Sequence, residues 1–145
     1  MKYLTIMVAV LVLLINLTGC SGATSPTTTF HSVPGQPIEA VSIRQSGTPN
    51  PGGGPIDITV KNVGSEPVIY LAITLKLVYA YTPDFEVVFY DVTPANPLLP
   101  GKSITQSKNQ YGPNGINRNT LYPLTINGTL ESGGEFSYVD QVEFK

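Results

Sequence analysis

The feature that most constrains the fold of this chain is a period of two in its apolar residues. In the stretch "PIDITVKN", isoleucine or valine occupies positions 56, 58 and 60, and Asp57, Thr59 and Lys61 follow them in alternation. In "VIYLAITLKLVYAYT", isoleucine or leucine occupies every odd position from 69 to 77. Successive side chains of a β-strand point to opposite faces, so this pattern predicts strands with one buried face. No stretch shows a convincing amphipathic-helix pattern.

Turn residues divide the chain into short alternating segments. Asn62 to Ser65 and Thr82 to Asp84 separate neighbouring segments, and the prolines of "PANPLLPG" (94–101) cannot continue a central strand. The predicted strands are 38–45, 56–62, 68–81, 85–92, 102–108, 120–131 and 135–144. Seven short strands without helices predict an all-β fold, an antiparallel β-sandwich.

The last two predicted strands contain two competing turn signals. Asn127-Gly128 is a strong hairpin dipeptide, but a turn there would place Leu124 opposite Glu131. A three-residue loop at 132–134 pairs apolar residues instead: Leu130 with Phe136, Leu124 with Val142, and Tyr122 with Phe144. A one-residue slip would turn every side chain to the other face, so we predict the turn at 132–134.

Asp140 is the exception in this hairpin, because the predicted register points it inward, opposite Ile126. A strand-end or bulge position would explain such a carboxylate. A weak calcium or polar site is the alternative.

The first twenty residues carry a targeting signal. Lys2 precedes a run of twelve apolar or near-apolar residues, from Leu4 to Ile15, which is too short to span a bilayer but fits a secretory signal peptide. The run ends in Leu17-Thr18-Gly19-Cys20, which resembles the lipobox of prokaryotic lipoproteins. The resemblance implies that residues 1–19 are removed and that the Cys20 thiol carries a diacylglycerol. Cys20 would then hold the protein by membrane lipid on the extracytoplasmic side of the cell membrane or the outer membrane. A chance cysteine at an ordinary cleavage site, or an uncleaved anchor, is the alternative.

Residues 20–37 are expected to form the lipidated cysteine and a flexible tether, because "SGATSPTTTFHSVPGQP" is uncharged and rich in Ser, Thr, Pro and Gly. The sandwich would occupy 38–145. Within it, "ITVKNVGSEPV" (58–68) resembles a strand passage of bacterial and archaeal surface domains of the immunoglobulin-like, CARDB-like kind, and "LTINGTLESGGEFSY" (124–138) resembles their last hairpin. This resemblance implies an immunoglobulin-like β-sandwich and no particular activity.

The chain offers little for catalysis, metals or cofactors. Its one histidine, His31, lies in the expected tether, so a nucleophile would have no histidine base, and a zinc or copper site would have no clustered ligands. The carboxylate pairs Asp84/Glu86 and Asp140/Glu143 are better explained as strand-end and surface charges than as a glycosidase pair. We therefore expect no enzyme activity, no metal and no cofactor.

Nucleic acid is not an expected partner. After loss of Lys2 with the signal, seven Lys and Arg face ten Asp and Glu, and no basic stretch remains.

Two surfaces are candidates for partner binding. If every strand crosses the sandwich, the segments 46–55, 82–84 and 109–119 lie at the end away from the tether. The last of these carries Tyr111, Asn114, Asn117 and Arg118, which form a possible partner-binding loop. An ordinary solvated loop is the alternative.

The second candidate surface is the outward face of 68–81 with Tyr70, joined by Tyr90 from the neighbouring strand. It could form a sugar or protein platform. Packing of this face against the second sheet is the alternative.

These observations predict a membrane-anchored lipoprotein that presents a non-catalytic immunoglobulin-like interaction module at the cell envelope. It would bind a protein or an envelope polymer such as a glycan. The alternative is an accessory subunit of an envelope complex or transporter.

The lipid anchor can be tested directly. Cys20→Ala should abolish lipid attachment and signal cleavage, because the thiol is the atom that accepts the lipid. Metabolic labelling with palmitate and gel mobility of the full chain would measure both steps, and Ser21→Ala serves as the matched control. A processed, acyl-free protein with Cys20 intact would contradict the assignment.

Overall fold

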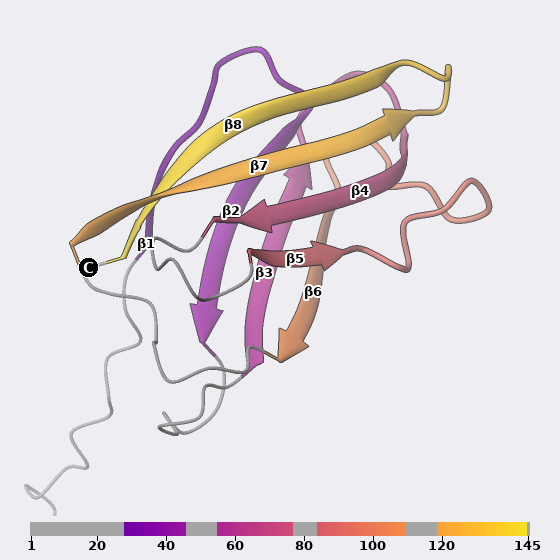
Figure 1. The fold of residues 1–145 in the computed structure, drawn as a ribbon. Coiled ribbons are helices and arrows are strands. Elements are labelled where there is room, and N and C mark those ends of the chain that lie inside the picture. Colours follow the sequence, from indigo (N-terminus) through magenta and orange to yellow (C-terminus); the bar gives the residue numbers. More distant parts are fainter. Residues whose placement is uncertain (1–27, 46–54, 77–83, 110–118, 145) are drawn as a thin grey trace, which may run out of the picture.

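The computed structural model describes residues 28–45, 55–76, 84–109 and 119–144. These residues form eight strands and no helix (Figure 1). The strands are β1 (Thr28–His31), β2 (Ile38–Gln45), β3 (Pro55–Asn62), β4 (Val68–Leu75), β5 (Phe85–Val88), β6 (Ser103–Asn109), β7 (Thr120–Leu130) and β8 (Glu135–Phe144). All pairings between them are antiparallel.

The strands form two sheets that pack as a sandwich. One sheet has the order β1-β8-β7-β4-β5 and the other β2-β3-β6, and Figure 1 shows the long β7–β8 pair lying across the second sheet. In immunoglobulin-like domains, strands A, B and E share one sheet and C, F and G the other. Here β2, β3 and β6 take the first set of places and β4, β7 and β8 the second. The expected immunoglobulin-like sandwich is therefore confirmed, with β5 and β1 extending one sheet at its two edges.

The core lies between the sheets and follows the period of two. Alternating positions of β3, β7 and β8 are buried, and β4 departs from this pattern because Ala72 is buried between Leu71 and Ile73. The ring of Tyr122 meets that of Phe144 edge-on with centroids 5.6 Å apart. Each fully buried aliphatic side chain stabilises the fold by about 1.5–3 kcal/mol. The largest fully buried side chains are Tyr122, Phe89, Ile38, Ile43, Ile56, Ile58, Leu71, Ile73, Leu75, Leu124, Ile126 and Val60.

Two predicted strands differ from the observed ones. The ladder between β4 and β7 shifts between Val68 and Tyr70, so Ile69 is an extra residue in a bulge and Val68 points into the core in its place. The predicted strand 85–92 ends at Val88, because the chain turns at Phe89, whose carbonyl accepts a hydrogen bond from the Val92 amide (2.9 Å).

The β7–β8 hairpin has the predicted facing but a different register. The loop is Glu131 to Gly133 rather than 132–134: the Leu130 amide donates to the Gly134 carbonyl (2.8 Å), and Gly133 takes the left-handed φ of 88°. Every partner is thereby displaced by two residues, which keeps each side chain on its predicted face. Phe136 now covers Gly128, where a Cβ would lie 2.3 Å from the Phe136 Cζ, so only glycine leaves room for the ring.

Part of the expected tether belongs to the sandwich. Residues Thr28–His31 form β1 and pair with the end of β8, with Thr28 opposite Phe144. Phe144 also pairs with Thr120, which follows segment 110–118. Thr28 therefore lies at the same end of the sheet as Asn119 and Thr120, which border this segment, whereas the sequence pattern predicts the start of the sandwich at the opposite end. The segment itself lies outside the described residues. Strand β1 was not predicted from the sequence, and its presence moves the start of the sandwich to the other end of the sheet.

The loops at the opposite end are held together by Asn62, a fully buried polar residue at the end of β3. Its Nδ2 donates to the carbonyls of Glu66 and Leu98 (both 2.8 Å), and its Oδ1 accepts from the Gly64 amide (2.9 Å). Its backbone bonds Lys102 and Gly101 at 2.9 and 2.7 Å. One side chain thus joins the β3–β4 turn to the long connection between β5 and β6.

We expect Asn62→Ala to lower the free energy of unfolding by about 3 kcal/mol, because three hydrogen bonds of the Asn62 side chain are lost, those to the Glu66 and Leu98 carbonyls and that from the Gly64 amide. Urea titration followed by circular dichroism would measure the change. Asn96→Ala is the matched control, since exposed Asn96 donates from Nδ2 to a single carbonyl, that of Asp91 (2.8 Å). Equal effects of the two changes would contradict the role of Asn62.

Candidate binding surface

The outer face of the five-stranded sheet is the leading candidate surface. Its middle rows follow from the register: Ala72, Asn127 and Ser137 lie side by side on β4, β7 and β8, and Thr74, Thr125 and Val139 form the next row. Tyr70 and Tyr90 lie at the end of this face. We call the following set the tyrosine face: Tyr70, Thr74, Tyr90, Thr125, Asn127, Ser137 and Val139.

Both tyrosines of this face are open to solvent. Tyr70 is 44% exposed and Tyr90 is 76% exposed. The Phe89 amide donates to the Leu71 carbonyl (3.0 Å), and the Phe89 side chain is buried. Tyr90 is the next residue, in the turn from Phe89 to Val92 that follows the β4–β5 ladder, and its ring is exposed near the end of β4 that carries Tyr70. Packing of this face against the second sheet, the alternative reading of the sequence, is excluded.

The tyrosine face is uncharged. Its polar groups are the hydroxyls of Thr74, Thr125 and Ser137 and the amide of Asn127, with Ser137 Oγ bonded to Asn127 Oδ1 at 2.7 Å. The acidic residues on this side of the sheet lie around it: Glu86 on edge strand β5, and Glu135 and Glu143 at opposite ends of β8. Val139 adds an apolar side chain, 52% exposed, in its middle.

The outer face of the three-stranded sheet is different in kind. Cross-strand pairs there join Glu39 to Lys61 and Arg44 to Asp57. Ser107 Oγ also donates to Asp57 Oδ1 at 2.5 Å. Its described outward residues on β2, β3 and β6 include no aromatic ring. This face is a charged, solvated surface, and the tyrosine face is not.

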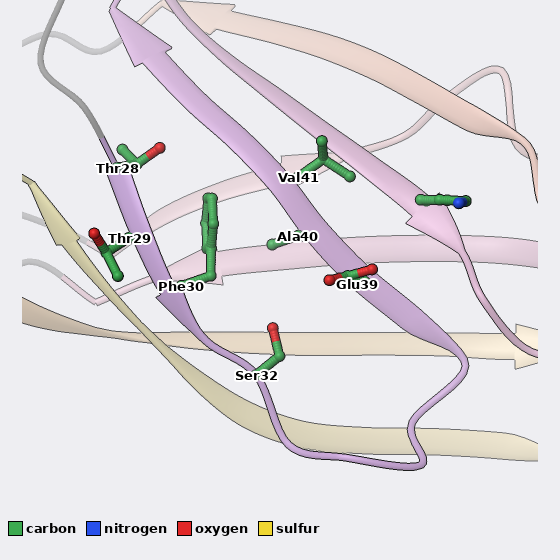
Figure 2. A pocket seen from close by; sticks show the side chains of 8 residues that line it. Thr28, Thr29, Phe30, Ser32, Glu39, Ala40 and Val41 are labelled. Atoms are coloured by element: carbon green, nitrogen blue, oxygen red, sulfur yellow. The ribbon is translucent and has the colours of Figure 1, made fainter.

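A second candidate is the groove between the edge strands β1 and β2, with a volume of about 630 Å³ (Figure 2). Figure 2 shows the Phe30 ring standing between the two strands, with Glu39 farther along β2. The groove contains no histidine or cysteine, so its hydroxyls have no imidazole base beside them. Its lining residues are Thr28, Thr29, Phe30, Ser32, Glu39, Ala40, Val41 and Lys61.

Asp140 fastens the chain between β1 and β2. It is 1% exposed, and its Oδ1 accepts a hydrogen bond from the Val33 amide at 2.8 Å. Its other oxygen is buried without a hydrogen-bond partner in the part of the chain that the structure describes. The neighbouring inward residue, Tyr138, donates from its hydroxyl to the Ile38 carbonyl. Burial raises the pKa of Tyr138 well above its ordinary value, and the nearby charge of Asp140 raises it further.

This arrangement corrects the sequence interpretation of Asp140. The residue lies opposite Leu124 rather than Ile126, inside the regular ladder and neither at a strand end nor in a bulge. Within the described ranges, no group of three or more His, Cys, Asp or Glu could hold a metal ion. A calcium site at Asp140 therefore has no support, and the backbone amide of Val33 accounts for its inward position.

Several predicted site residues lie outside the described residues. These are Cys20 and the loop residues Tyr111, Asn114, Asn117 and Arg118. Sequence reasoning identified Tyr70 and Tyr90 but missed Val139, although the alternation of 135–144 places it between the outward residues Ser137 and Gln141.

The comparisons with known proteins add nothing to the site. No protein-family model and no curated protein matches the chain. The chain is similar to a crystal structure of a Bordetella pertussis protein assigned as ApaA, at 17% identity and a TM-score of 0.39, over 81% of this chain and 89% of that chain. It is also similar to the X-ray structure of a structural genomics target, at 13% identity and a TM-score of 0.40, over 83% and 87%. At such TM-scores neither likeness carries an argument.

Among the residues that the structure describes, no helix has the length and apolar character to cross a membrane.

The raised pKa of Tyr138 predicts a stability change at high pH. Stability from the neutral phenol is complete below the unfolded-state pKa of about 10 and is lost as the pH rises above it. Between pH 9 and 12, the melting temperature of the native chain should therefore fall more steeply than that of Tyr138→Phe. At pH 7 the variant should be less stable by about 1–2 kcal/mol, because the Ile38 carbonyl loses its donor.

Thermal melts of both chains across this pH range would test the prediction. Tyr90→Phe is the control, since its ring is exposed and its slope should match that of the native chain. Parallel curves for Tyr138→Phe and the native chain would contradict the assignment.

Proposed function

We propose that this protein is a membrane-anchored lipoprotein whose immunoglobulin-like sandwich is a non-catalytic binding module of the cell envelope. The lipobox-like sequence ending at Cys20 supports the anchor, and the tyrosine face supports the binding role. One observation carries the proposal: Tyr70 on an uncharged sheet face and Tyr90 in the turn at its end are both exposed, whereas the other outer face is charged and lacks rings. Tyrosine offers a large, stiff contact area with a polar tip and is enriched at interfaces.

The position of the tyrosines fits an anchored module. Seven residues lie between Cys20 and Thr28, so Thr28, the first residue of β1, would stay within about 29 Å of Cys20. Thr28 pairs with Phe144 at one end of β8, and Tyr70 lies near Glu135 at the other end, through Thr129. At about 3.4 Å per residue, β8 carries the tyrosines about 30 Å farther from the anchor.

The alternative, an accessory subunit of an envelope complex or transporter, has one observation in its favour. The end of the sandwich opposite Thr28 exposes Val63 and Leu99, held on loops that Asn62 fixes. Leu99 begins a tight turn in which its carbonyl accepts from the Lys102 amide (3.1 Å) and Gly101 has a φ of 76°. A rigid apolar tip of this kind suits packing against a protein subunit.

Photocrosslinking in cells would separate the two functions. A benzophenone amino acid would replace Tyr90, Leu99 or Thr105 in the full chain, the last being a control on the charged outer face. We expect crosslinked product from position 90 and none from position 105. Product from position 99 alone would favour the accessory subunit, and product from none of the positions would contradict a binding role.

A further inference from the structure

We propose that the tyrosine face binds a neutral, hydroxyl-rich polysaccharide strand. This inference rests on the proposed use of that face for binding and names the chemistry of its ligand. It follows from three properties of the face: its aromatic rings, its hydrogen-bonding groups and its charge.

The rings supply the apolar contact. A sugar ring presents C–H groups on its faces and hydroxyls around its edge. A tyrosine ring is apolar across its face and polar at its tip, so Tyr70 and Tyr90 can cover a sugar face and still bond to a hydroxyl. Tyr70 is on β4 and Tyr90 is in the turn that follows β5, one residue after Phe89, whose amide bonds the Leu71 carbonyl, so the two rings can contact successive parts of one chain.

The middle of the face supplies matching polar groups. Thr74, Thr125 and Ser137 have hydroxyls, and Asn127 has an amide, all of which offer both donor and acceptor capacity. Sugar hydroxyls also donate and accept. A surface built of such groups can bind a ligand without charge. A polysaccharide chain could run across it from the tyrosines over β4, β7 and β8.

Charge disfavours polyanionic envelope polymers. The carboxylates of Glu86 and Glu135 border the tyrosine face, and its own side chains carry no charge. A polyanion would meet repulsion from this acidic rim. A neutral strand would not.

The backbone that carries Tyr70 is closely packed. The bulge at Ile69 precedes Tyr70, and the Tyr70 carbonyl lies 2.7 Å from where a Cβ would stand on Gly128 of β7, so β4 and β7 approach closely there. Asn127 and Ser137 are bonded to each other in the same part of the sheet. Groups fixed before binding lose little entropy when the ligand arrives.

Affinity electrophoresis of the detergent-solubilised full chain would test the inference. The gels would contain hydroxyethyl cellulose, xylan, galactomannan or, as the polyanion, alginate. We expect retardation by at least one neutral polysaccharide and none by alginate. The Tyr70→Ala/Tyr90→Ala double variant should bind at least tenfold more weakly, and Thr105→Ala, on the other outer face, should bind as the native chain does.

A second variant guards against a folding defect. Val139→Glu keeps both tyrosines and places a negative charge in the neutral middle, so it should also weaken binding at an unchanged melting temperature. Retardation that survives both variants would overturn the site, and stronger retardation by alginate would overturn the ligand class. A lack of retardation on every neutral gel, with crosslinking from position 90 to a protein intact, would overturn the polysaccharide while leaving the proposed binding role in place.

Discussion

The structure depends on the pairing of β7 with β8. Ten residue pairs, from Thr120 with Phe144 to Thr129 with Glu135, assign each side chain of the hairpin to the core or to solvent. Strand β4 adds to β7 and β1 adds to β8, so their residues inherit this assignment. The same alternation that buries Leu124 and Ile126 therefore produces the uncharged outer face. A slip of one residue in the β7–β8 register would turn the buried side chains outward and the exposed ones inward. The core and the binding face therefore both follow from this register.

Where the chain passes from one sheet to the other, the alternation of inward and outward residues ends, and buried polar side chains hold the chain in place. Strand ladders end at these crossings, so backbone amides and carbonyls need other partners. Asn62 supplies them between β3 and β4, and Asp140 and Tyr138 supply them between β1 and β2. An aliphatic residue at any of these positions would leave the bonded backbone groups without this partner. These polar side chains fix how the two sheets are joined.

The fold class and the facing of most strands could be predicted, because both follow from local alternation. The register of β7–β8 could not be settled, since either glycine of the loop can take the left-handed conformation and both choices give the same facing. Strand β1 was missed because "TTFH" has no alternation of its own and forms through pairing with residues more than a hundred positions away. The outward direction of Tyr70 could be predicted from the alternation of inward and outward residues in its strand. Its neutral surroundings could not be predicted, because they depend on the strand order, which brings Asn127 and Ser137 beside β4. The lipid anchor at Cys20 and the loop with Tyr111 and Arg118 stay predictions.

Strand β1 also determines how the domain would respond to mechanical load. If Cys20 is fixed in a membrane and the tyrosine face holds a polymer, tension passes from the anchor into the sheet through β1. Hydrogen bonds between antiparallel strands lie perpendicular to the strands, so a pull along β1 strains its pairs with β8 together rather than one after another. The four residue pairs of β1 therefore resist the pull together, as a shear-loaded contact between two strands. Asp140 and Tyr138 hold the following segment, so the load reaches β2 only after β1 has yielded.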